Sequence, residues 1–523
     1  MLAIRMRELC KPPTAWNRAL WTVSSLTSLK EVLEAAKVRR DGILSDASLS
    51  NLQHTTSVLI GKDPGVGDDN VRKYLQRQLT GKSVITPGSL SAATIEQSIR
   101  AMESNYLLRW ADHIDQGLPD AVIEQCARCV VSHLLNSGHS LTAVSHCIRD
   151  AVLTPSSTVT RAGDLIRELH SLASLPPANY QAVFPVVSAP DSGKTKSESW
   201  MRGGELVAWM KHNNVPPFQA NERVGGAVTF TVTACDRPAA ENMAATRFVA
   251  LRDRAVLGAR KPIESLGYFW LTGSTDRVSI IPPDRGVEVA SIRRQDMIYS
   301  VDESNPRISR AISLLAELDH GPSSAAVTSG WAALESLSMG PAEDGDRIET
   351  AVRIAALVTA SFVRAELTTL AFSYAKSNKD QTANEIKIAT NNRERCAKIM
   401  RRLLAAPQPK FGRLEDEAGA KRIVQLLGDP VNTLKRINLY IEATFRRLYR
   451  LRNLVAHGGR TDSIVLEAGV RAVAPLVGAA VDRIHHSSTS EGLGPVELIA
   501  RAQQRIGLLD ATDKTELISL LDQ

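Results

Sequence analysis

From Asn305-Pro306 to the end of the chain, apolar residues recur at spacings of three and four, which constrains the fold strongly. That spacing places apolar side chains on one face of an α-helix, and such a face must be buried against neighbouring elements. Gly-Pro pairs at 321–322 and 340–341 end the first two helices of this region. Further helices are expected at 348–374, 384–404, 415–427, 431–455, 465–485 and 496–509. We therefore predict an all-α C-terminal bundle.

Residues 201–304 have a different pattern. Runs rich in β-branched and aromatic residues occur at 227–233, 268–272 and 277–281, and Gly273 and Pro282-Pro283 follow the last two. Such runs bounded by Gly or Pro are typical of short β-strands. The middle of the chain is therefore predicted to be a small, antiparallel, β-rich domain.

The first 200 residues are predicted to be mainly helical. One apolar stripe with helical spacing ends at 117–119, and it consists of Ile95, Ile99, Met102, Tyr106, Trp110 and Ile114. A second helix is expected at 120–135, and Pro176-Pro177 with the Ser-rich stretch 188–199 indicates a linker. The expected fold class is a predominantly helical α+β protein. Its parts are a helical region at 1–200, a β-rich domain at 201–304, a helical bundle at 305–488 and a helical tail at 489–523.

Composition excludes several classes of protein. No apolar run approaches the roughly 20 residues that cross a bilayer, so no contact with a membrane is expected. Six cysteines at irregular spacing among 523 residues do not form a disulfide framework, which favours a reducing compartment such as the cytoplasm. A net charge of +7 over this length permits a nucleic-acid partner without requiring one.

Most of that positive charge is concentrated in one segment. Residues 435–460 contain seven Lys and Arg and one acidic residue, Glu442, which gives a local charge of +6. This excess predicts a phosphate-binding surface around Arg452 and His457. The alternative is a solvated helix face on which His457 caps the helix end before Gly458-Gly459. Five residues apart, Arg452 and His457 point about 140° away from each other in a continuous helix. They converge only if the helix ends or bends near Ala456.

The order of residues at this position resembles a known family. Arg452-Asn453-x-x-x-His457 matches the Arg-x4-6-His motif of the HEPN superfamily, including the polar residue that often follows the Arg. The segment 330–337, Gly-Trp-Ala-Ala-Leu-Glu-Ser-Leu, is similar to the first core helix of the ApeA-like HEPN group. The resemblance covers residues 305–488.

The resemblance implies a helical bundle that forms a homodimer, with two Arg/His motifs facing one cleft. Many members of the superfamily are metal-independent endoribonucleases, so neither a metal nor a cofactor is expected. By this resemblance Arg452 would hold the scissile phosphate, and His457 would transfer a proton as the ribose 2′-OH attacks phosphorus. Guanidinium and imidazole groups suit these roles, because one is a planar fork for phosphate oxygens and the other titrates near neutrality.

Other residues near the motif have two interpretations each. Asn453 would orient Arg452 or His457, or it is an ordinary amide on the helix surface. The arginines Arg447, Arg450 and Arg460 are predicted to bind RNA, although they could equally solvate the helix, the interpretation favoured for Arg446. Glu335 would lie near the cleft, or it is an exposed residue one turn after Trp331.

Two weaker motifs point to other chemistry. Cys126-x2-Cys129-x3-His133, followed by His139, His146 and Cys147, could begin a zinc site, but its spacing is also that of a buried helix stripe. Residues 188–195 resemble a P-loop, except that Ser188 replaces its first Gly and no helix start follows. We therefore expect neither a zinc site nor nucleotide hydrolysis.

These observations predict a regulated RNA-cleaving protein. The C-terminal bundle would cleave RNA in antiviral defence or in a toxin-like role, and the upstream regions would sense an unknown trigger or restrain the nuclease. The alternative is a HEPN-like module without catalysis, which binds RNA or dimerises and uses the motif only for helix packing.

Overall fold

A computed structural model describes the chain except for residues 12–15, 17–19, 82–83, 118, 154–158, 191–198, 301–304, 341–347, 510–513 and 523, and the side chains of 120 and 121. The described residues form two compact units. Unit 1 comprises 1–136, 148–170 and 285–523, and unit 2 comprises 137–147 and 171–284. The chain therefore leaves unit 1 twice and returns to it twice. The prediction of a predominantly helical α+β protein is confirmed.

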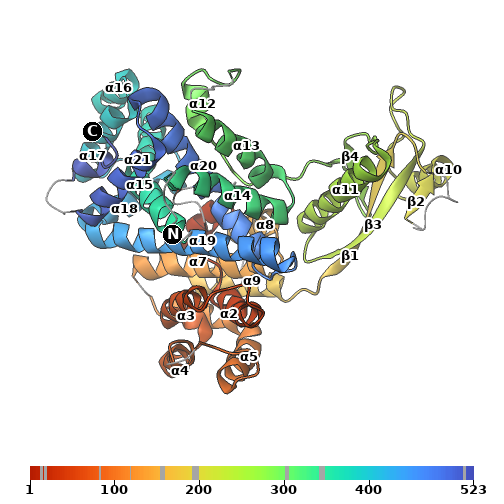
Figure 1. Ribbon diagram of the computed structural model, residues 1–523, viewed down its shortest axis with the longest axis horizontal. Helices are drawn as coiled ribbons and strands as arrows, with labels where there is room; N and C mark the ends of the chain where they lie inside the picture. The colour runs from red at the N-terminus through yellow and green to blue at the C-terminus, as the bar shows by residue number, and fades with distance from the viewer. Residues whose placement is uncertain are drawn as a thin grey trace. The chain divides into compact units, whose positions relative to one another are not determined.

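Unit 1 is helical and contains both ends of the chain (Figure 1). Its N-terminal helices are α1 (Leu2–Leu9), α2 (Ser25–Arg40), α3 (Asp46–Gly61), α4 (Asp69–Leu79), α5 (Leu90–Glu103), α6 (Tyr106–Ile114) and α7 (Asp120–Asn136), with the short 3-10 helix η1 (Pro64–Val66). The helices α8 (Leu141–Leu153) and α9 (Ala162–Ala173) contribute residues to both units.

The later helices of unit 1 follow the predicted pattern closely. They are α12 (Ala290–Arg294), α13 (Pro306–His320), α14 (Ser323–Ser338), α15 (Glu349–Ser377), α16 (Gln381–Ile388), α17 (Asn392–Leu404), α18 (Leu414–Gly428), α19 (Pro430–Gly458), α20 (Leu466–Glu491), α21 (Pro495–Gly507) and the 3-10 helix η3 (Glu516–Ile518). The helix expected at 384–404 is interrupted, because Asn391 accepts a hydrogen bond from Glu394 N and begins α17 as a new helix. The stripe predicted at 95–114 is buried, but it is divided between α5 and α6.

The central helix of unit 1 is α15, which packs against α16, α17, α18, α19 and α21. Within the described residues α15 alone has the length and composition of a membrane-spanning helix, and 72% of its most apolar window is buried inside the protein. Because its side chains fill the core among other helices, its apolar character is explained by helix packing.

The N-terminal helices and the C-terminal bundle share one core, so the boundaries predicted for unit 1 need correction. Trp21 packs edge-on against Phe362 of α15 at 5.9 Å, and Arg422 of α18 forms an ion pair with Glu8 of α1 at 2.8 Å. At the other end, α20 crosses the predicted boundary at 488, and α21 buries Leu498 in the same core. Neither 1–200 nor 489–523 is a separate part.

Unit 2 is built around a five-stranded antiparallel sheet in the order β2-β3-β1-β4-β5. The strands are β1 (Ala178–Val186), β2 (Trp200–Arg202), β3 (Gly226–Ala234), β4 (Tyr268–Leu271) and β5 (Val278–Ser279). Helix α11 (Arg237–Ala259) covers one face over Phe184 and Phe269, and α10 (Gly203–His212) covers the other over Val183 and Trp270. Alternate residues of β1 thus face opposite helices, as a pleated strand requires.

The sequence predicted β3, β4 and β5 but placed the start of this domain too late. Strand β1 begins directly after Pro177 and lies inside the region expected to be helical. It is a central strand of the sheet. Pro185, which has no N–H to donate, is tolerated there because the ladder to β4 pairs only Ala182 and Val183. Helix α11 also lies within the predicted β-rich segment, and residues from 285 onwards belong to unit 1.

Asp236 connects two helices of unit 2. Its carboxylate accepts hydrogen bonds from the backbone N–H of Ala239 at 2.9 Å, which caps α11, and from that of Ser140 at 2.8 Å, whose Oγ caps α8. His139 lies 3.5 Å away. Burial raises the pKa of this carboxyl, but His139 and the hydrogen bonds from the two backbone groups outweigh burial and lower it to about 2.

We expect Asp236→Ala to destabilise unit 2 by about 1–2 kcal/mol, because α11 loses its cap and the N–H of Ser140, the capping residue of α8, loses its acceptor. Since the folded pKa is lowered, the stabilisation is complete above the unfolded pKa of about 3.9 and is lost as the pH falls towards 2. Amide hydrogen exchange at Ser140 and Ala239, measured between pH 3 and pH 6, checks this. Equal protection in both proteins at pH 6 would contradict the capping role.

Candidate functional site

The predicted motif lies at the C-terminal end of α19. This helix is long, runs from Pro430 to Gly458 and packs against α14, α15 and α20. It ends because Gly459 adopts the left-handed conformation with φ +60°, which residues with a Cβ rarely adopt. The N–H groups of Gly459 and Arg460 then both reach the carbonyl of Leu454. The sequence signal Gly458-Gly459 thus marks a true helix end, and His457 lies in the last turn.

Arg452 and His457 are in direct contact. Arg452 Nη1 lies 3.0 Å from His457 Nε2 and 3.0 Å from the side-chain oxygen of Asn453. The helix continues two residues beyond Ala456, where the sequence suggested that it would end or bend. The two side chains meet because the long arginine side chain reaches around the last turn of the helix to the imidazole.

A guanidinium can only donate, so this contact is a hydrogen bond when the imidazole has its lone pair on Nε2 and its hydrogen on Nδ1. A phosphate oxygen that took the hydrogen bond of Arg452 would release this lone pair next to the bound phosphate. The pair can thus exchange an internal contact for a contact with substrate.

The three motif residues differ in exposure. His457 is exposed, Arg452 is half-buried, and Asn453 is only 8% exposed. The buried Asn453 therefore accepts a hydrogen bond from Arg452, while His457 faces solvent. Of the two interpretations of Asn453, the structure supports the orienting one for Arg452.

Two of the arginines that were predicted to bind RNA are buried, which corrects that prediction. Arg447 Nε and Arg450 Nη2 each lie 2.9 Å from the carboxylate of Glu31 on α2, and all three side chains are at most 6% exposed. Burial raises the pKa of Glu31, but the charges and hydrogen bonds of the two arginines outweigh burial and lower it. Arg447 and Arg450 hold α19 against α2 and do not present charge to a ligand.

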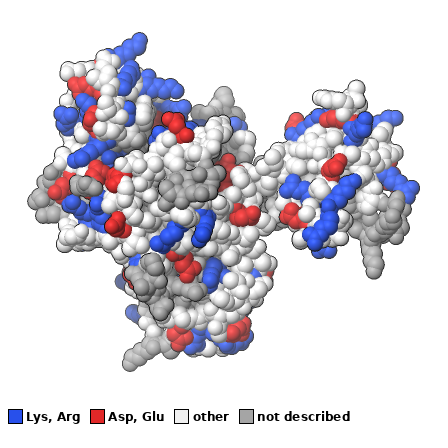
Figure 2. Space-filling view, turned by 45° about the horizontal axis from the view of Figure 1, so that its top comes forward, with Lys and Arg blue, Asp and Glu red and all other residues white. Residues whose placement is uncertain are grey.

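Two further cations of this segment have acidic neighbours. Arg460 lies 3.8 Å from Glu34 of α2 and 3.3 Å from Asp462, and Arg446 forms an ion pair with Glu442 at 2.7 Å. Burial raises the pKa of Glu34, although Ser463 and Arg460 act in the opposite direction. On the surface of unit 1 that Figure 2 shows, basic and acidic side chains are interspersed. Acidic side chains therefore offset part of the local charge of +6, while Lys435 and Arg436 are exposed and form no ion pair within the described residues.

Glu335 is not a partner of the motif arginine. It lies half-buried on α14, one turn after Trp331, whose ring packs 4.9 Å from that of Tyr449 on α19. This contact places α14 beside the motif helix. Within the described residues, however, Arg452 bonds only to His457 and Asn453.

The zinc motif corresponds to a buried helix face. Cys126, Cys129 and His133 all lie inside unit 1 on α7, and His133 packs 4.5 Å from the ring of Tyr106. Burial raises the pKa of both thiols, which disfavours the thiolate that zinc binding requires. In the described part of the chain, no three His, Cys, Asp or Glu side chains are placed to hold a metal ion. In the P-loop-like stretch, residues 191–195 lie outside the described residues.

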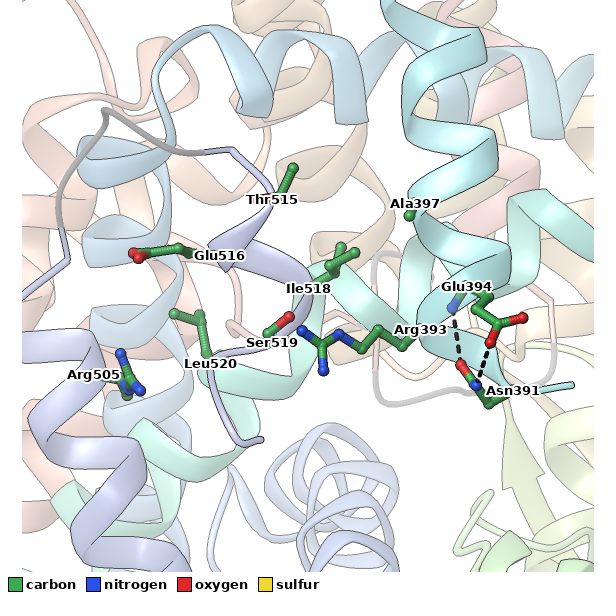
Figure 3. A pocket seen from close by; sticks show the side chains of 10 residues that line it. All are labelled: Asn391, Arg393, Glu394, Ala397, Arg505, Thr515, Glu516, Ile518, Ser519 and Leu520. Atoms are coloured by element: carbon green, nitrogen blue, oxygen red, sulfur yellow. Dashed lines mark hydrogen bonds between the residues drawn. The ribbon is translucent and has the colours of Figure 1, made fainter. Parts of the chain in front are cut away.

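A pocket of about 690 Å³ lies elsewhere in unit 1, between α17, α21 and η3 (Figure 3). Arg393 points towards Ser519 at its centre, and Arg505 lies across from it, while Asn391 holds Glu394 through a hydrogen bond of 2.9 Å. Arg393 also lies 3.7 Å from Asp522. Neither Arg452 nor His457 lines this pocket.

Comparisons with known proteins identify no family for this chain. No protein-family model, no curated protein and no solved structure matches this chain.

Proposed function

We propose that this protein is a metal-independent endoribonuclease of the HEPN type. One observation carries the proposal: Arg452 and His457 meet at 3.0 Å at an accessible helix end, with Asn453 buried behind the arginine. A guanidinium beside an imidazole supplies both functions that RNA cleavage by the 2′-OH needs, which are phosphate binding and proton transfer.

In the proposed reaction the ribose 2′-oxygen forms a bond to phosphorus and the bond from phosphorus to the 5′-oxygen breaks. Arg452 donates hydrogen bonds to the non-bridging oxygens, where negative charge increases in the transition state. The lone pair on His457 Nε2 takes the proton of the 2′-OH, and a proton from the imidazolium or from water neutralises the leaving 5′-oxygen. The products are a 2′,3′-cyclic phosphate and a 5′-hydroxyl. No oxidant, metal or cofactor is required.

The resemblance to the HEPN superfamily also implies an oligomeric state and a cellular role. A homodimer would bring two Arg452/His457 pairs to one cleft, in a cytoplasmic protein of antiviral defence or with a toxin-like role. The ion pairs from Glu31 to Arg447 and Arg450 support a restraining role for the N-terminal region, because α2 holds the helix that carries the motif. The trigger would then act by changing how α2 packs on α19.

The alternative is a HEPN-like module that binds RNA or dimerises without cleaving. It would use Arg452 and His457 only to close the end of α19. The exposed position of His457 favours catalysis over this role, because a residue used only for packing gains nothing from facing solvent.

We expect the purified protein to cleave single-stranded RNA in excess EDTA and to leave 2′,3′-cyclic phosphate ends. Mass spectrometry of the products identifies those ends, and untreated RNA gives the background. Binding without products under all conditions would support the module without catalysis. Cleavage that EDTA abolishes would contradict the proposed chemistry.

A further inference from the structure

We infer that the C-terminal half of α11 in unit 2 is a binding surface for the phosphate backbone of RNA. Five basic residues lie between 247 and 261, namely Arg247, Arg252, Arg254, Arg260 and Lys261, against one acidic residue, Asp253. The local charge is therefore +4 in 15 residues. In the described part of the chain, none of these five cations forms an ion pair.

This differs from the basic segment of unit 1. There, carboxylates pair with four of the seven cations, which are Arg446, Arg447, Arg450 and Arg460. Of the five cations at 247–261, all except the half-buried Arg252 are exposed. Lys and Arg side chains gather on the face of unit 2 that Figure 2 shows. Unit 2, which does not contain the motif, thus presents a group of uncompensated positive charges.

The placement of the cations suits an extended polyanion. Arg247 and Arg254 are seven residues apart, so they lie on the same side of α11 about 10 Å from each other. Arg260, the C-cap with φ +54°, and Lys261 add two exposed cations directly after the helix ends at Ala259. Cations repeated along a line match the repeated charges of a nucleic-acid strand, and each contact releases counterions.

A lipid surface suits this helix less well. Helices that lie on membranes need an apolar face opposite their cations. The apolar face of α11, formed by Ala240, Ala244, Ala245 and Phe248, is already buried on the sheet of unit 2. Exposed Val256 and Leu257 at the end of the helix do not replace that face. Charge complementarity therefore favours RNA as the occupant.

The inference rests on the proposed function only in the choice of RNA as the partner, and binding is measured separately from cleavage. In the full chain with His457→Ala, affinity for a fluorescent single-stranded RNA is determined by anisotropy at several salt concentrations. Adding Arg254→Glu and Lys261→Glu is expected to weaken binding at least about 10-fold near 0.1 M salt. Loss of two phosphate contacts should also reduce the log–log salt slope by about 1.4.

The matched control is Lys211→Glu with Arg223→Glu, which changes the charge of unit 2 equally at two exposed residues outside α11. This control is expected to retain most of the affinity, and circular dichroism shows that both variants fold. Equal weakening by both pairs, or no RNA binding by the parent protein, would overturn the inference. Binding to phosphatidylglycerol vesicles in place of RNA would overturn it as well. Failure of the nuclease proposal would be seen separately, as equal cleavage by wild type and His457→Ala.

Discussion

Replacing His457 with Ala is expected to lower the rate of RNA cleavage by about 10²–10⁴-fold, the usual contribution of a general acid or base. The imidazole is exposed in the last turn of α19, and within the described residues its one side-chain hydrogen bond is with Arg452, so its removal should not disturb the core. RNA affinity should remain within a few-fold of the wild type, because the cations that bind phosphate are unchanged. Single-turnover cleavage and anisotropy measure the two quantities on the same samples.

The chain offers a matched control in His212, which is also an exposed histidine in the last turn of a helix, α10. His212→Ala should cleave RNA at the wild-type rate. If His457→Ala were equally active, His457 would have no catalytic role, and the module without catalysis would be the better description.

Replacing Glu31 with Gln is expected to destabilise unit 1 by about 3–5 kcal/mol, because Arg447 and Arg450 would stay buried without a counter-charge. The folded pKa of Glu31 is lowered, so its stabilisation is present above the unfolded pKa of about 4.3 and is lost as the pH falls below it. Urea unfolding, with hydrogen exchange of the α19 amides as a local readout, measures the change.

Glu442→Gln on the same helix is the matched control, since Glu442 pairs with Arg446 at i,i+4 near the surface. We expect it to cost only about 0.5 kcal/mol. A triple variant, Glu31→Leu with Arg447→Met and Arg450→Leu, should recover much of the stability, because it leaves no buried charge unpaired. A loss below about 1 kcal/mol in Glu31→Gln would show that water reaches the arginines and that they do not hold α19.

Local patterns predicted most of the helices but not how distant segments meet. Spacing of apolar residues located α15 and α19 within a few residues, because a buried helix face repeats every three to four positions. Strand β1 was missed because Pro176-Pro177 and Pro185 are typical of loops, whereas its pairing partners on β3 lie at least 40 residues away. The interleaved units could not be predicted, since no local signal records that a chain returns to an earlier core.

The same limit applies to the site. Arg452, Asn453 and His457 are close in sequence, so a motif could locate them together. The burial of Arg447 and Arg450 depends on Glu31, for which the surrounding sequence of α2 contains no distinguishing pattern. A cluster of cations in a sequence gives charge, but only the fold shows which of those charges are compensated.

During synthesis, Glu31 is made long before the arginines of α19 that pair with it. Arg447 lies 416 residues after Glu31. At about 5–20 residues per second, a ribosome needs roughly 20–80 seconds to make the intervening chain. Throughout that time Glu31 has neither arginine partner, and the Arg452/His457 pair does not yet exist. A nascent chain thus completes the helix that carries the motif only after helices α2 to α18 have been made.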